Sequence, residues 1–140
     1  MMTPRLQIDI VKIRHNARVL IRKLRRLGIA TTGVTKAFLG LPELAQAFVD
    51  AGVCGLGDAR IENIEAMRRG HVTAKMMMIR SPMLSQVERV VASADLSLNT
   101  EPEVISALSL AAKASGRMHE VVLMVELGDL REGIMPSELA

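Results

Sequence analysis

Residues 31–40 read TTGVTKAFLG, a short β-branched run that stops at Lys36 and passes into a loop ending in glycine. β-branched residues favour strands, so the run IATTGVT over residues 29–35 predicts a β-strand. Most lysines lie on helix faces or in polar loops, so a lysine at the end of an apolar strand calls for a physical reason. The sequence on either side places this strand in a repeating fold.

Strands and helices alternate along the rest of the chain. Further strands are expected to begin near residues 53, 76, 95 and 121, each preceded by a helical segment. One helix opens at Pro42 and closes at Gly52, and another is expected to open with a capping box formed by Thr100 and Glu103. Alternation with such short connections predicts parallel strands covered by helices.

Two architectures satisfy this alternation, an open doubly wound sheet and a closed barrel. No G-x-G-x-x-G fingerprint follows the first strand, which weakens the dinucleotide-binding version of the open sheet. An eight-stranded barrel takes about 250 residues. We therefore expect an α/β fold, a parallel (β/α)8 TIM-type barrel that is incomplete. Residues 1–140 would form its N-terminal part in about five βα units, with the other strands and any C-terminal domain outside the chain.

The segment ahead of the first unit is expected to be a short strand, LQIDI over residues 6–10, followed by a helix over 11–27. Apolar residues recur on one face of this helix at helical spacing. They are Ile13, Ala17, Leu20, Leu24 and Leu27. Arginines line another face, which is expected to be solvated. They are Arg14, Arg18, Arg22 and Arg25.

Composition indicates a soluble globular protein, which we expect in the cytoplasm. Hydrophobic residues make up 49% of the chain, and the net charge is only +3. Tryptophan and tyrosine are absent, so the basic helix lacks the interleaved aromatics of many nucleic-acid-binding surfaces, and no nucleic-acid partner is expected. No apolar run is long enough to span a membrane, and no secretory leader is evident. Cys54 stands alone in an apolar stretch, so we expect it to be buried and unreactive.

The position of Lys36 suggests chemistry. In a parallel barrel the C-terminal strand ends form the active face. Alternation along the strand places Val34 and Lys36 on the same side. A lysine pointing inward there would be partly desolvated, which favours the uncharged, nucleophilic amine that can attack an aldehyde such as that of pyridoxal 5′-phosphate (PLP). A lysine that reaches out into solvent is the alternative.

Five stretches resemble, in order, the PLP-dependent amino-acid racemases of the alanine racemase barrel type, and most closely their ornithine racemase-like branch. They are GVTKAFLG (33–40), GLGDARIENI (55–64), MIRSPMLS (78–85), LSLNTE (96–101) and VVLMVELGDLREGI (121–134).

The resemblance implies a PLP enzyme that racemises a small-molecule amino acid and forms a homodimer. Lys36 matches the lysine that binds the cofactor covalently and serves as a catalytic base. Arg131 matches an arginine near the phenolic oxygen of PLP, although a loop arginine paired with Asp129 or Glu132 is the alternative. A PLP-binding barrel protein without catalysis, or an inactive fragment, remain the other readings of the chain.

Three more residues at strand ends are candidates for the wall of the site: Arg80, Asp58 and Asn99. For Asp58 the alternative is a helix cap, and for Asn99 a turn residue. Glu126 is expected to share a face with Met124, either in the site or in a buried pair.

Several groups are not expected among these residues. His15, His71 and His119 have no metal-like spacing, so no metal is predicted. The chain has no tyrosine to act as a second acid or base. Loops after the last barrel strands usually hold the phosphate, so we expect the 140-residue chain alone to bind PLP weakly.

Overall fold

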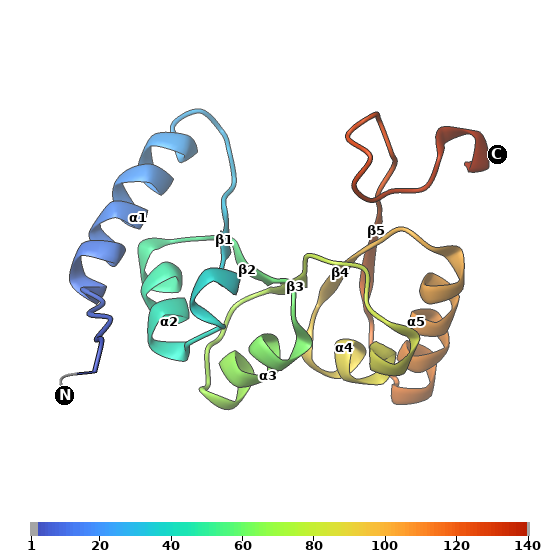
Figure 1. Ribbon diagram of the computed structural model, residues 1–140, viewed down its shortest axis with the longest axis horizontal. Coiled ribbons are helices and arrows are strands. Elements are labelled where there is room, and N and C mark those ends of the chain that lie inside the picture. Colours follow the sequence, from blue (N-terminus) through green and yellow to red (C-terminus); the bar gives the residue numbers. More distant parts are fainter. Residues whose placement is uncertain (1–2, 140) are drawn as a thin grey trace.

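The computed structural model describes residues 3–139 and contains one five-stranded parallel sheet with strands in chain order (Figure 1). The strands are β1 (Thr32–Val34), β2 (Gly55–Asp58), β3 (Met76–Met78), β4 (Leu96–Asn99) and β5 (Glu120–Leu123). The helices are α1 (Ile10–Arg25), α2 (Pro42–Ala51), α3 (Ile61–Arg69), α4 (Val87–Ser93) and α5 (Pro102–Ser115). Short 3-10 turns are η1 (Lys36–Phe38), η2 (Leu84–Gln86) and η3 (Pro136–Glu138).

The sheet is curved, and Figure 1 shows α2 to α5 along its convex side while the concave side is uncovered. All four strand pairs are parallel and join consecutive strands, as expected for successive βα units. An open doubly wound sheet would instead reverse its strand order part-way. The α/β fold with an incomplete parallel barrel is therefore confirmed.

The core lies between the convex side of the sheet and the helices. Leu56 and Met76 are in register and fully buried, and both face the helix layer. Ile64 and Met67 of α3 and Leu108 of α5 complete this layer at 0–1% exposure. Burying each such side chain contributes about 1.5–3 kcal/mol, so this layer dominates the stability of the chain.

The concave side carries the alternate residues of each strand, because side chains of a strand point to opposite faces. Val34 and Val122 lie on this side and are 44% and 43% exposed. Gly57 leaves room there for Ile79, since a Cβ at Gly57 would lie 2.8 Å from Ile79 Cγ2. At the N-terminal end of the same side, Lys75 of the β3 lead-in donates to both oxygens of Glu120 at 2.8 Å.

Both edges of the sheet are open within the described residues. β1 pairs only with β2, and β5 pairs only with β4. The run EVVLMVEL was predicted as one strand, but regular pairing ends at Leu123 and the chain then forms an isolated bridge between Val125 and Ile134. β5 is exposed along its whole length because nothing covers it.

The start of the chain differs from the prediction. Residues 6–9 form no strand, because Asp9 caps α1 by accepting a hydrogen bond from the Lys12 amide at 3.0 Å. Leu6 is 87% exposed, with no strand beside it to pair with. The N-cap preference of aspartate therefore outweighs the alternating pattern of LQIDI.

The orientation of α1 was also predicted only in part. Leu20 and Leu27 were expected to face inward but are 54% and 68% exposed, and Ile21 is the buried residue of the helix. The arginine face is not simply solvated, because Arg14 pairs with Asp50 at 3.5 Å and Arg25 donates to the Gly52 carbonyl at 3.0 Å. These cations complement the C-terminal end of the α2 dipole. Ile13, Ala17 and Leu24 of the predicted apolar face are partly buried.

Two local predictions are wrong. The capping box of Thr100 and Glu103 does not form, because the helix begins one residue later, with Glu101 as N-cap and Pro102 in the first turn. Cys54 is exposed rather than buried, and its thiol lies 3.2 Å from the Thr31 carbonyl beside the open edge of the sheet. Within residues 3–139, no helix is both long and apolar enough to cross a bilayer.

Candidate functional site

Lys36 lies immediately beyond β1, at the C-terminal end of the sheet, where it begins η1. Val34, two residues earlier, lies on the concave side. The backbone leaves the extended conformation at Thr35, with φ −104° and ψ −7°, so strand alternation does not fix the side on which Lys36 lies. Its side chain is exposed, so the predicted desolvation is not found in the described chain. The physical reason is that no opposing wall covers the concave side of this open sheet.

The backbone under Lys36 is fixed by its neighbour Thr35, which is fully buried. The Thr35 amide donates to the Gly57 carbonyl at 2.9 Å, and its hydroxyl donates to Asp58 Oδ2 at 2.6 Å. These bonds tether the end of β1 to the end of β2. Lys36 is therefore exposed but held at the strand ends rather than on a free loop.

Asp58 occupies the centre of a buried polar cluster. Besides Thr35, its carboxylate accepts from the Arg60 amide at 3.0 Å and from Asn63 Nδ2 at 2.9 Å. It is 0% exposed and lies in register with Met78 on the helix side. Asp58 therefore bonds to the start of α3 and does not reach the concave side. This placement resembles the predicted helix-cap role more than the predicted role in the wall of the site.

Replacing Asp58 with alanine is expected to destabilise the chain by about 3 kcal/mol, because two buried donors and one partly buried donor lose their acceptor. Urea unfolding monitored by circular dichroism measures the change. Asp50→Ala removes an exposed carboxylate on α2 and serves as the control, with a much smaller expected effect. An equal loss of stability in both variants would show that the buried cluster contributes nothing special.

Asn99 ends β4 on the helix side, in register with Leu123 and fully buried. Its amide donates to the Ser97 hydroxyl at 3.0 Å, and that hydroxyl lies 2.9 Å from Nε2 of His119. Burial lowers the pKa of His119. Asn99 therefore belongs to a polar network beneath α5 and faces away from Lys36. Its Oδ1 is buried without a partner among the described residues.

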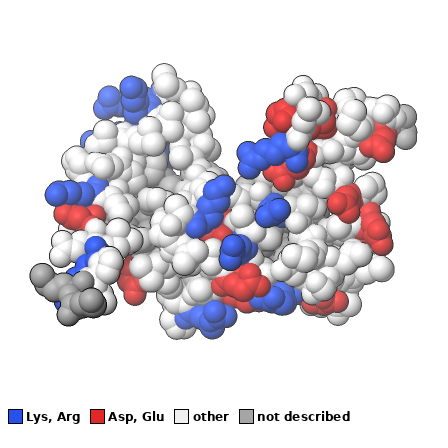
Figure 2. Space-filling view, viewed as in Figure 1, with Lys and Arg blue, Asp and Glu red and all other residues white. Residues whose placement is uncertain are grey.

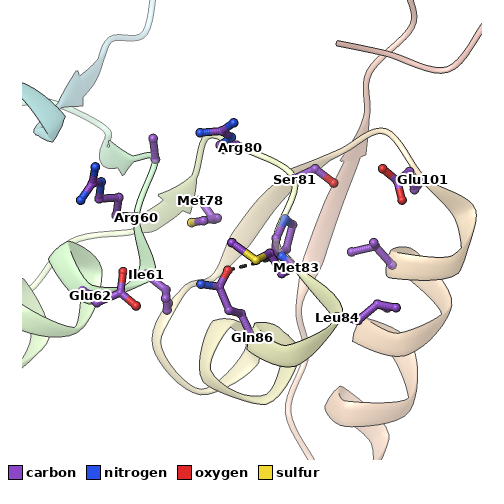
Figure 3. Close-up of a pocket in the computed structure, with 13 residues that line it drawn as sticks. Arg60, Ile61, Glu62, Met78, Arg80, Ser81, Met83, Leu84, Gln86 and Glu101 are labelled. Carbon is purple, nitrogen blue, oxygen red and sulfur yellow. Dashed lines mark hydrogen bonds between the residues drawn. The ribbon is translucent and has the colours of Figure 1, made fainter.

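Arg80 borders a cavity of about 650 Å³ at the C-terminal ends of the strands. Figure 3 shows Arg60 and Arg80 along its upper border and Glu101 at the opposite side, with Met78 and Met83 between them. Neither Lys36 nor Arg131 lines this cavity. Arg80 therefore lies at the C-terminal ends of the strands, beside a cavity that does not include Lys36.

Arg131 lies in the loop that follows β5, and its side chain is exposed. The loop is organised around Glu126, which is 9% exposed. Its carboxylate accepts from the amides of Gly128, Leu130 and Arg131. The amides of Leu130 and Gly128 hold the pKa of Glu126 below its ordinary value. This contribution to stability is present above the unfolded pKa and lost as the pH falls through the lowered one.

These backbone contacts could not be predicted from the residues alone. Glu126 was expected either in the site or in a buried pair, and the structure instead gives it three main-chain partners. The available indications were the nearby glycines at 128 and 133, which permit a tight loop.

The candidate site therefore has two basic groups at one end of the sheet. Lys36 follows β1 and Arg131 follows β5, so they lie at the same C-terminal end but on opposite edge strands. The space-filling view shows the molecule hollowed between α1 and the C-terminal segment, with lysine or arginine side chains at its border (Figure 2). Within residues 3–139 no group of three metal-ligating side chains converges.

Comparison with known proteins identifies the family. The model for "Alanine racemase, N-terminal domain" matches residues 8–140, which is nearly the whole chain. The chain belongs to the alanine racemase N-terminal domain family. The chain is 36% identical to an ornithine racemase from Acetoanaerobium sticklandii over 137 residues, and 34% identical to a lysine racemase from Thermotoga maritima over 134 residues. These matches cover 98% and 96% of this chain but 38% of each relative.

Solved structures support the fold of this family member. An alanine racemase from Streptomyces lavendulae superposes with a TM-score of 0.83 over 98% of this chain and 37% of that one, at 23% identity. A D-threonine aldolase from Filomicrobium marinum gives 0.84 over 96% of this chain and 37% of that one, at 18% identity. Because enzymes of different reactions share this architecture, the structural likeness shows the fold alone.

Members of the alanine racemase family use PLP, and the donor set of this chain fits part of that cofactor. Lys36 supplies an accessible primary amine for the aldehyde, and Arg131 supplies a permanently charged planar donor suited to a phenolate oxygen. A helix N-terminus or amide cluster is the usual phosphate site. The amides after β5 are already taken by Glu126, so they do not fill that role.

Proposed function

We propose that the whole protein is a PLP-dependent amino-acid racemase in which Lys36 binds the cofactor. The observation that carries this proposal is an exposed amine, tethered through Thr35 at the C-terminal end of the sheet, within a chain that matches the racemase family over residues 8–140. The chain spans about 38% of the length of the racemases it matches, so the activity belongs to the whole protein rather than to these residues alone.

The proposed roles follow from the chemistry of each group. When bound, PLP withdraws electrons from the α-carbon of the substrate and makes its proton removable. Lys36 holds the cofactor and moves a proton on one side of that carbon. Arg131 fixes the phenolate oxygen by a charged hydrogen bond. The group on the opposite side is not a tyrosine of these 140 residues, because the sequence contains none.

We propose an amino acid with a basic side chain as the substrate, because the two relatives above 30% identity are named for ornithine and lysine. A homodimer is proposed on the family resemblance. Its oligomeric state can be measured by light scattering of the full-length gene product.

Incubating the full-length gene product with PLP and L-ornithine or L-lysine in deuterium oxide tests the proposal. The expected result is deuterium at Cα together with loss of optical rotation, faster for these substrates than for L-alanine. Cleavage of a β-hydroxy amino acid such as threonine to an aldehyde, with no racemisation of ornithine or lysine, would indicate an aldolase and contradict the proposal. PLP binding with no exchange at Cα would instead favour a cofactor-binding protein without catalysis.

A further inference from the structure

The loop after β5 is built around a carboxylate instead of a hydrophobic residue. Glu126 is 9% exposed, and a buried carboxylate is costly unless several donors converge on it. Three main-chain amides do so, with Leu130 and Arg131 at 3.1 and 3.2 Å and Gly128 closer still. Among the ion pairs of residues 3–139, none involves Glu126, so main-chain dipoles provide the compensation.

The backbone of the loop is shaped for this purpose. Gly128 and Leu130 have φ angles of 110° and 52°, which turn successive amides toward the inside of the loop. The base is closed by hydrogen bonds from the Glu126 amide to the Ile134 carbonyl at 2.9 Å and from the Ile134 amide to the Met124 carbonyl at 2.8 Å. A Cβ at Gly133 would lie 2.7 Å from the Val125 carbonyl carbon, so only glycine permits this closure.

Arg131 is itself one of the three donors. Its amide is bonded to Glu126 Oε2, while its side chain remains exposed. The Arg131 side chain therefore extends from a backbone segment that is held by the bond between the Arg131 amide and the Glu126 carboxylate. No other element of the described chain crosses this loop to hold Arg131 in place through a hydrogen bond or ion pair of its side chain.

We propose that Glu126 is a positioning residue, whose carboxylate fills a ring of inward-facing amides and thereby fixes the backbone from which Arg131 reaches the C-terminal end of the sheet. The consequence for the cofactor rests on the proposed function, because it requires Arg131 to contact PLP. The effect on the loop itself does not depend on PLP.

Amide hydrogen exchange in the full-length gene product, measured by NMR without cofactor, tests the effect on the loop. In Glu126→Ala, exchange at Gly128, Leu130 and Arg131 is expected to accelerate at least about tenfold, because each amide loses a charged acceptor. Glu132→Gln removes the same charge within the same loop and should leave these rates unchanged. Acetate, added to Glu126→Ala, is expected to restore part of the protection by occupying the emptied ring.

Unchanged exchange in Glu126→Ala, or equal acceleration in Glu132→Gln, would overturn the inference. Circular dichroism separates this result from global unfolding. Should Glu126→Ala unfold, Glu126→Gln provides the second variant, since it keeps one acceptor oxygen and should accelerate exchange by a smaller factor. Full protection in a folded Glu126→Gln, with no difference among the three amides, would equally overturn it.

A double-mutant cycle in the PLP-loaded full-length gene product tests the action through Arg131. Glu126→Gln is expected to weaken PLP binding several-fold and to shift the absorbance band of bound PLP, and to add nothing in an Arg131→Ala background. Additive effects would show that Glu126 does not act through Arg131. If the parent protein holds no PLP through Lys36, the proposed function fails, whereas the exchange result still decides the role of the carboxylate.

Discussion

Replacing Lys36 with alanine is expected to abolish covalent PLP binding and to reduce racemisation by at least about a thousandfold. The variant removes the amine that binds the aldehyde and the group that moves the proton, while Thr35 and its bonds to β2 remain. Borohydride reduction followed by peptide mass spectrometry locates the covalent link in the parent protein. Absorbance titration with PLP measures its loss in the variant.

Lys75→Ala is the matched control, because Lys75 lies at the opposite, N-terminal end of the sheet, where it pairs with Glu120 at 2.8 Å. It should retain covalent PLP and racemase activity. Methylamine is expected to restore a small part of the activity of Lys36→Ala by supplying a free amine. Covalent PLP on a lysine other than Lys36, or full activity of Lys36→Ala, would contradict the assignment.

A polypeptide of these 140 residues is expected to self-associate at micromolar concentration. The cause is β5, whose amides have no neighbour on one side and whose residues Val121 and Leu123 are 43% and 39% exposed. Light scattering coupled to size-exclusion chromatography measures the mass. Such an edge templates pairing with another chain, so the expected species are dimers and larger aggregates.

The double substitution Val121→Lys with Leu123→Lys is expected to restore a monomer, because lysines on an edge strand oppose strand addition. Leu110→Lys changes an equally apolar residue on α5, 68% exposed, and should leave the association unaltered. A stable monomer of the parent chain would show that its open edge is not adhesive. Absorbance recorded on the same column after incubation with PLP reports whether the cofactor co-elutes with the chain. Binding of PLP to these 140 residues is expected to be weak.

The strand–helix rhythm was predictable because each unit carries its own local patterns. Pro42 and Gly52 bound α2 as predicted, and Gly116 ends α5 in the left-handed conformation. The strand expected near residue 76 is a run of methionines, which form β3 (Met76–Met78) by pairing between β2 and β4. Strand order follows from parallel units joined by right-handed crossovers.

The failures arise where tertiary contacts decide between local alternatives. Asp9 serves as an N-cap instead of a strand residue, and arginines of α1 contact the C-terminal end of α2 instead of solvent alone. Cys54 is exposed because it lies just before β2, at the N-terminal end of the sheet. None of these contacts is encoded by periodicity within one segment.

In the candidate site, the end of the sheet at which each residue lies was easier to predict than the face of the sheet toward which its side chain points. Lys36 and Arg131 lie at the C-terminal end of the sheet as expected from their places after β1 and β5. Asp58 and Asn99 also end strands, but their side chains point into the helix layer, because strand register decides which face a residue occupies.

The ion pair between Lys75 and Glu120 joins β3 to β5 and passes over β4. Neighbouring strands lie about 4.8 Å apart, so this pair spans two strand spacings. The side chains of Lys75 and Glu120 come closer together when the sheet is curved toward their side. Glu120 pairs with Lys75, whereas Lys36 has no carboxylate within ion-pair distance in residues 3–139. Glu120 therefore offsets a positive charge at the N-terminal end of the sheet, while no ion pair within residues 3–139 engages Lys36 at the C-terminal end.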